Sequence, residues 1–151
     1  MTARIKYKKE RETVAEWLDL KHLSLKNGNS TFIYLKVLEK GLNRNSVDSF
    51  IKHSSLTKGQ VSGLLHVSER TLQRYSSEKT MDINASERLI NLTRLFHKGI
   101  DVFNEKEKFI KWLNRPSKSL GNSKPIEIIE TNIGIDLVMD ELLRIEHGVF
   151  S

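Results

Sequence analysis

The chain of 151 residues predicts an all-α protein, in which a helix-turn-helix bundle is followed by a second, small helical domain. Apolar residues recur at helical spacing along most of the chain. Segment 58–77 has the pattern of two short helices joined by a tight turn. Several of these stretches begin and end with residue types that start and stop helices. Together these three observations indicate helices and no sheet.

Before residue 55 the sequence predicts three helices and one loop. The loop is KNGNS at 26–30, whose residue types favour turns. Segment 32–42 fits both a strand and a helix, because some apolar residues alternate and others recur every three or four positions, and a helix is favoured. The helices are expected at 10–25, 32–42 and 45–54. Their inward residues are Val14, Trp17, Leu18, Leu25, Val47, Phe50 and Ile51.

Residues 58–77, KGQVSGLLHVSERTLQRYSS, carry the most informative pattern of the chain. Counted from the first residue, apolar side chains fall at positions 4, 8, 10, 15 and 18, a spacing that packs two crossing helices onto a third. Ser62 is the small residue required where the two helices touch. His66 stands in the turn, where positive φ favours glycine. Ser68 is a natural N-cap, and Glu69 suits the dipole of the second helix.

This helix pair is typical of proteins that read duplex DNA, because the second helix can lie in the major groove. Arginine can bind O6 and N7 of guanine, glutamine can pair with adenine, and flanking lysines can contact phosphates. The expected DNA-binding residues are Lys58, Ser68, Glu69, Arg70, Thr71, Gln73, Arg74 and Lys79. The alternative is an ordinary polar helix face, since similar helix pairs occur in proteins that never touch DNA.

After the helix pair, a long helix is expected from a cap at Asn84 or Ser86 to Phe103. Asn104 and Glu107 resemble a capping box, which predicts that the next helix begins at Asn104 and runs to residue 114. Both helices carry broad apolar stripes, and these are interpreted as core faces.

Both prolines of the chain lie in RPSKSLGNSKP at 115–125, which predicts an irregular link. Pro125 suits the first turn of a short helix at 125–131. The last helix is expected to begin near Gly134, and Gly148 is expected to stop it as the C′ residue. A tail with two large apolar side chains follows, formed by Val149, Phe150 and Ser151.

The net charge of +6 is unevenly distributed. Segments 1–40, 41–103 and 104–151 carry +4, +3 and −1, so only the first two thirds favour contact with a polyanion. The absence of cysteine excludes disulfides, thiolate zinc sites and cysteine nucleophiles. The five histidines have no metal-ligand spacing, and no glycine-rich phosphate loop is present. An enzyme, a cofactor and a metal site are therefore not expected.

No apolar run approaches the roughly 18 residues that span a bilayer. The N-terminus MTARIKYKKERE also lacks the apolar core of a secretory signal. A cytoplasmic protein without membrane contact is therefore expected.

Residues in a specific order mark the C-terminal third. They are Trp112, Leu113, Pro116, Leu120, Gly121, Pro125, Thr131, Gly134, Val138, Leu142 and the run RIEHGVF at 144–150. In this order they resemble the toxin-binding domain of the Xre/MbcA/ParS antitoxins, and an Xre-like helix-turn-helix upstream completes that architecture. The resemblance covers about residues 44–151. Asn122 stands where the family commonly has a second glycine, and asparagine also tolerates positive φ.

The resemblance implies a type II antitoxin, which neutralises a co-expressed toxin by direct binding and acts as a transcription repressor of its own operon. The implied partners are a RES-domain toxin, which consumes NAD, and operator double-stranded DNA. A homodimer, joined to the toxin in a higher-order complex, is also expected. In the family the C-terminal end reaches toward the active site of the toxin. The residues carried over as toxin-binding are Arg144, Glu146, His147, Val149, Phe150 and Ser151.

Three domains are therefore expected: an N-terminal extension 1–43, expected to be helical; an Xre-like helix-turn-helix domain 44–103; and a small helical toxin-binding domain 104–151. The alternative is a stand-alone helix-turn-helix transcriptional regulator whose C-terminal helices serve only for dimerisation. The Val-Phe tail distinguishes the two, because it is costly in water and can anchor in a pocket of a partner.

Overall fold

The structure of the protein is a computed structural model that describes residues 14–20 and 30–148. These residues form helices and no strand, apart from an isolated bridge between Ser117 and Ser123, which confirms the all-α class. The chain divides into two compact units, 1–93 and 94–151. The domain boundaries expected after residues 43 and 103 remain predictions.

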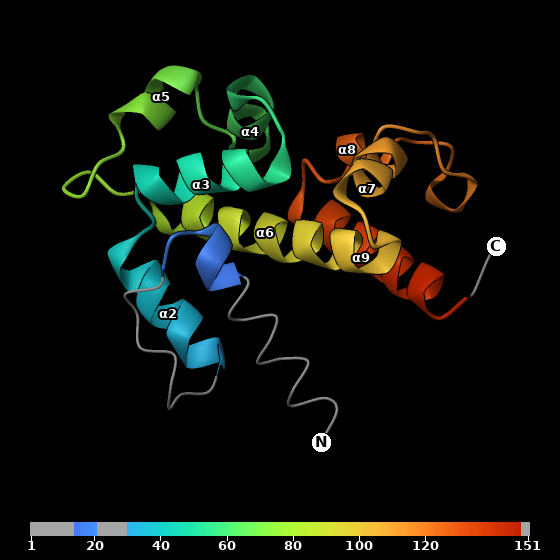
Figure 1. Cartoon of the computed structure of the whole chain (residues 1–151). Coiled ribbons are helices and arrows are strands. Elements are labelled where there is room, and N and C mark those ends of the chain that lie inside the picture. The colour runs from blue at the N-terminus through green and yellow to red at the C-terminus, as the bar shows by residue number, and fades with distance from the viewer. Residues whose placement is uncertain (1–13, 21–29, 149–151) are drawn as a thin grey trace. The chain divides into compact units, whose positions relative to one another are not determined.

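Figure 1 shows the order of the helices along the chain. They are α2 (Ser30–Lys40), α3 (Arg44–Ser54), α4 (Lys58–Leu65), α5 (Glu69–Arg74), α6 (Ile83–Phe103), α7 (Lys106–Leu113), the 3-10 turn η1 (Lys118–Leu120), α8 (Pro125–Ile128) and α9 (Asn132–Glu146). No helix in the part of the chain that the structure describes is long and apolar enough to cross a membrane.

The N-terminal part of the first unit differs from the expected helix 10–25. Residues 14–17 are helical and a turn follows, in which Asp19 has φ of 55°. A left-handed residue interrupts a right-handed helix, so the prediction of one helix through this point is wrong. Val14, Trp17 and Leu18 are buried as predicted, whereas Leu25 lies outside the described residues.

Helix α2 confirms the helical interpretation of 32–42, and it begins at Ser30, which was assigned to the loop. The other loop residues lie outside the described part. Helix α3 confirms the helix predicted at 45–54, with Val47 and Phe50 buried. Asn43 caps α3 by accepting a hydrogen bond from the backbone N–H of Ser46 at 3.3 Å.

Helix α6 is capped by Asp82, and not by Asn84 or Ser86 as predicted. The Asp82 carboxylate accepts a hydrogen bond from the backbone N–H of Ala85 at 2.8 Å. Ser86 is instead buried, and its hydroxyl accepts a hydrogen bond from the backbone N–H of Leu42 at 3.0 Å. Ser86 thereby satisfies a buried donor 44 positions away, a role that local sequence patterns do not reveal.

The start of α7 also differs from prediction. Asn104 has φ of 63°, so it lies in the left-handed region at the end of α6 and cannot begin a helix. Helix α7 follows Glu105, whose side chain makes no capping hydrogen bond, and the proposed capping box with Glu107 is wrong. Phe109 is fully buried, and its ring covers Gly99 of α6 so closely that a Cβ at Gly99 would overlap with it.

The link at 115–125 is irregular, as predicted, and it is well ordered by hydrogen bonds. Its η1 turn ends at Gly121, and Asn122 adopts the expected positive φ of 61°. The Ser119 hydroxyl donates to the buried Glu141 carboxylate of α9 at 2.6 Å. This hydrogen bond attaches the link to the side of α9.

Helices α8 and α9 form the end of the second unit. Pro125 opens α8 at its first turn as predicted, although α8 ends at Ile128 and not at residue 131. Helix α9 begins two residues before Gly134, and the Thr131 hydroxyl caps it by accepting a hydrogen bond from the backbone N–H of Gly134 at 2.9 Å. Gly148 follows α9 with φ of 71°, which confirms it as the residue that stops the helix.

Candidate DNA-reading helix pair and C-terminal surface

Helix α4 is held by caps at both of its ends. The Thr57 hydroxyl accepts a hydrogen bond from the backbone N–H of Gln60 at 3.1 Å, and the Gln60 side chain accepts one from the backbone N–H of Thr57 at 3.0 Å. This capping box satisfies two N–H groups that the helix leaves without partners. At the other end His66 has φ of 58° and ψ of 35°. The left-handed turn predicted at His66 is confirmed.

Helix α5 begins at the predicted N-cap. The Ser68 hydroxyl accepts a hydrogen bond from the backbone N–H of Thr71 at 3.0 Å and lies 2.9 Å from the Thr71 hydroxyl. Leu72 is buried, and α5 packs through it on α3 and α4. Tyr75, also buried, ends the helix, and burial, followed by the Asp82 carboxylate, raises the pKa of its phenol.

The outer side of α5 carries the side chains expected to read bases. Arg70 and Arg74 are exposed and one helical turn apart, so both project from the same side. Gln73, Ser68 and Glu69 are also exposed, whereas Thr71 is half-buried. The helix-turn-helix predicted from 58–77 is therefore present with an accessible second helix, and the base contacts themselves stay a prediction.

The lysines expected at phosphates flank this helix pair. Lys58, the first residue of α4, and Lys79, in the turn after α5, are both exposed. The Ser76 hydroxyl accepts a hydrogen bond from the backbone N–H of Lys79 at 3.0 Å, and the backbone N–H of Ser76 donates to the Lys79 carbonyl at 2.9 Å. This closed turn fixes the backbone that carries the Lys79 side chain.

Glu69 has a structural neighbour that the sequence did not reveal. A Cβ built on Gly59 would lie 3.0 Å from the Glu69 carboxylate, so Glu69 rests beside the first turn of α4. A carboxylate is stabilised near a helix N-terminus by the helix dipole. Glu69 therefore helps to join the two helices, which is a role separate from its predicted contact with DNA.

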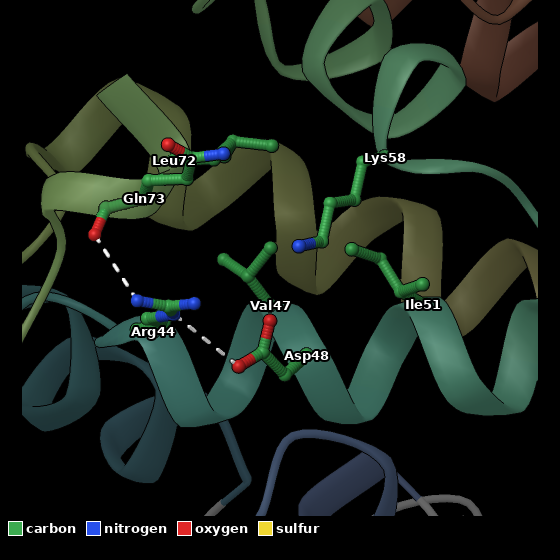
Figure 2. A pocket seen from close by; sticks show the side chains of 7 residues that line it. All are labelled: Arg44, Val47, Asp48, Ile51, Lys58, Leu72 and Gln73. Carbon is green, nitrogen blue, oxygen red and sulfur yellow. Dashed lines mark hydrogen bonds and ion pairs between the residues drawn. The ribbon is translucent and has the colours of Figure 1, made fainter. Parts of the chain in front are cut away.

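Arg44 is a further residue that sequence reasoning missed at this site. Its guanidinium donates to the backbone carbonyl of Gln73 at 3.3 Å and pairs with the Asp48 carboxylate at 3.5 Å (Figure 2). The contact joins the first turn of α3 to the last turn of α5. The only sequence signal was an arginine beside a predicted helix start, which is too common to attract attention.

A small hollow lies between α3, α4 and α5 (Figure 2). Its volume is about 10 Å³, which is room for about one water molecule. The hollow is therefore too small for an organic ligand. Its lining residues are Arg44, Val47, Asp48, Ile51, Lys58, Leu72 and Gln73.

Replacing His66 by glycine is expected to stabilise the first unit by about 0.5–1 kcal/mol, because glycine adopts the left-handed conformation without a Cβ clash. Urea unfolding measures the change. Lys52→Gly is the control, since Lys52 is exposed inside helix α3, and there an exchange to glycine is expected to lower stability by about 1 kcal/mol. A loss of stability with His66→Gly would contradict the assigned turn conformation.

Three of the residues predicted to bind a partner lie at the end of α9: Arg144 and Glu146 in its last turn, and His147 as its C-cap. Arg144 is exposed and pairs with Glu141 at 3.4 Å. Glu146 lies 2.7 Å from the Lys98 ammonium, and both side chains are largely shielded from solvent. His147 is exposed, and its backbone N–H donates to the Leu143 carbonyl at 3.1 Å. The other predicted residues, Val149, Phe150 and Ser151, lie outside the described part.

The Lys98–Glu146 ion pair was not foreseen, since its partners are 48 positions apart. It attaches the last turn of α9 to α6. Glu146 therefore has a structural role in the free chain in addition to any contact with a partner. Within residues 14–20 and 30–148, no group of three His, Asp or Glu side chains could hold a metal ion.

Two family models match the chain. The Antitoxin Xre-like helix-turn-helix domain matches residues 35–94, which contain α3, α4 and α5. The Antitoxin Xre/MbcA/ParS C-terminal toxin-binding domain matches residues 98–148, which contain α7, α8 and α9.

Two curated relatives are similar over most of their length, and both bear the name Antitoxin Xre. The protein from Photorhabdus laumondii is 31% identical over 117 residues, which are 76% of this chain and 79% of the relative. The protein from Yersinia enterocolitica is 30% identical over 116 residues, which are 76% of this chain and 78% of the relative.

Proposed function

The chain belongs to the Xre antitoxin family, with a helix-turn-helix domain and a toxin-binding domain, and on this premise we propose that it neutralises a RES-domain toxin and represses its own operon. As an Xre-type antitoxin it is a regulatory protein and not an enzyme. The proposed toxin consumes NAD, and the proposed setting is the cytoplasm, where toxin and operator are both accessible.

The proposed mode of neutralisation is occlusion of the toxin active site by the C-terminal end of the antitoxin. The observation that carries it is the end of α9, where Arg144 and His147 are exposed and the Lys98–Glu146 ion pair holds the last turn against α6. The tail Val149-Phe150-Ser151 follows directly. Burying a large apolar side chain in a pocket contributes about 1.5–3 kcal/mol, so the tail residues are suitable anchors.

The proposed repression uses the exposed side of α5. Arg70, Gln73 and Arg74 supply donors that match base edges in the major groove, and Lys58 and Lys79 supply charge for phosphates. A two-fold-symmetric operator requires a homodimer, which we propose as the form that binds DNA, with a higher-order complex when toxin is present. The alternative of a stand-alone regulator is disfavoured, because the match over 98–148 is to a toxin-binding domain.

The proposal is tested with the toxin encoded beside the chain's own gene. Cells that express this toxin alone are expected to lose NAD and stop growing, and co-expression of the full antitoxin is expected to restore both. A chain that ends at Gly148 is expected to bind the purified toxin more weakly and to protect poorly. A full-length variant with Val149→Ser and Phe150→Ser is the control for chain length and should behave like the shortened chain.

The outcomes separate the parts of the proposal. Equal protection by the full and shortened chains would refute occlusion by the tail. Growth arrest with normal NAD levels would refute the RES assignment, while leaving the antitoxin function intact.

A further inference from the structure

Large apolar side chains are exposed along α9. Ile133 is 83% exposed, Leu137 is 44% exposed and Leu143 is 37% exposed. Ile133 and Leu137 are one turn apart on one side of the helix, and Leu143 borders that side two turns further on. The opposite side of α9 forms the core, with Val138 and Leu142 fully buried. Helix α9 therefore has an outer apolar surface in addition to its core face.

Acidic side chains accompany this surface. Asp136 and Asp140 are exposed and lie on the same outer side of α9 as Ile133 and Leu137. Segment 125–148 contains six acidic residues and one basic residue, Arg144. We define the α9 outer face as Ile133, Asp136, Leu137, Asp140 and Leu143. Its two carboxylates stand among the apolar side chains and outnumber Arg144, the one basic residue on the same side, so the face is an apolar strip with a net negative charge.

The helix that carries this face is rigidly held. At its start, the Thr131 cap and the close approach of Gly134 to the Ile128 backbone fix its direction. At its end, Lys98 pairs with Glu146 at 2.7 Å. A preorganised surface loses little conformational entropy when a partner binds, which favours affinity.

We propose that the α9 outer face is a contact surface for the toxin, separate from the tail, and that it meets an apolar patch bordered by basic residues on that protein. The inference rests on the proposed function. It is supported by continuity, since Arg144 and His147, predicted to touch the toxin, lie on the same side of α9 in the following turns. It is also supported by the match of this segment to a toxin-binding domain.

The net negative charge of the α9 outer face distinguishes between the partners that could bind there. A two-fold dimer through this face would bring the same surface of two copies together and place carboxylates against carboxylates, which is repulsive. Duplex DNA is a polyanion and is repelled for the same reason. A protein partner with basic residues around an apolar patch complements both features of the face.

The inference is tested by the affinity of the full-length antitoxin for the purified toxin encoded beside its gene. The variant Ile133→Ser with Leu137→Ser is expected to raise Kd about tenfold or more, because exposed apolar anchors at an interface centre account for much of binding. Ile83→Ser is the matched control, since Ile83 is 59% exposed in the other unit and its loss should leave Kd unchanged. Circular dichroism checks that each variant stays folded.

A second variant tests the charge argument. Asp136→Lys with Asp140→Lys is expected to slow association, and the difference from the unmodified chain should shrink at high salt, because surface charges are screened. An unchanged association rate at low salt would overturn the assignment of a basic partner surface.

Failure of the inference can be distinguished from failure of the proposed function. If the unmodified antitoxin does not bind this toxin at all, the proposed function is wrong. If it binds, and the Ile133→Ser, Leu137→Ser variant binds equally well, the function stands and the inference is overturned. If that variant loses dimerisation by sedimentation and keeps its toxin affinity, the face joins two antitoxin copies and the inference is also overturned.

Discussion

Gly134→Ala is expected to destabilise the C-terminal unit by about 3 kcal/mol, near the upper end of overpacking effects. A Cβ at this position would overlap with the backbone carbonyl oxygen of Ile128 and press on the Thr131 hydroxyl that caps α9. A flexible side chain could move away from such a clash, whereas a backbone carbonyl at the end of α8 cannot. The substitution therefore separates α8 from α9 or breaks the cap.

The effect is measured by urea unfolding with tryptophan fluorescence. The sequence has two tryptophans, one in each unit, so Trp17→Phe makes Trp112 a probe of the C-terminal unit alone. In that background Gly134→Ala should strongly lower the urea concentration at which half of the C-terminal unit is unfolded. It should also weaken toxin binding. Operator binding should change much less, because the helix pair lies in the other unit.

Gly63→Ala is the matched control for this substitution, and Trp17 reports on it in a Trp112→Phe background, because both Gly63 and Trp17 belong to the other unit. Gly63 lies inside α4, and a Cβ there meets no atom within 4 Å. Alanine at such a position is expected to be neutral or to stabilise by about 0.5–1 kcal/mol. If Gly134→Ala unfolds at the same urea concentration as the unmodified chain, the close contact between α8 and α9 is not rigid and this part of the fold description is wrong.

The helix pair could be predicted well because its residue types suit the local conformations of a turn and of a helix N-cap. His66 and Ser68 act on backbone groups within a few positions, so their roles in the turn and the cap are visible in the sequence. Asn104 shows the limit of the same reasoning. Asparagine is suitable both as an N-cap and in the left-handed position after a helix, and the structure places Asn104 in the left-handed position.

Contacts between distant positions could not be predicted from one sequence. Arg44 reaches the Gln73 carbonyl across 29 positions, and the Lys98–Glu146 pair spans 48. The α9 outer face is different, because Ile133 and Leu137 stand one turn apart in the sequence and outside the inward stripe. That spacing is visible in the sequence, but one sequence does not show which of two apolar stripes on a helix stays exposed.

Arg70→Ala is expected to weaken operator binding by about 1–3 kcal/mol, roughly one to two powers of ten in Kd, if Arg70 binds O6 and N7 of a guanine. The structure supports this expectation, since Arg70 projects from the exposed side of a helix whose start is fixed by the Ser68 cap. Loss of a bidentate contact should also reduce discrimination at one base pair. Loss of a phosphate contact would weaken all sequences alike.

The measurement is a gel-shift titration with and without toxin, using the natural operator and versions with single guanine replacements. Arg115→Ala removes the same charge from an exposed position in the C-terminal unit and should leave affinity nearly unchanged. Lys79→Ala should weaken binding to every operator version similarly. It should also reduce the slope of log Kd against log salt concentration by about one. If Arg70→Ala shifts all versions as the unmodified chain does, Arg70 makes no base contact, and if Arg74→Ala behaves in the same way, α5 is not the reading helix.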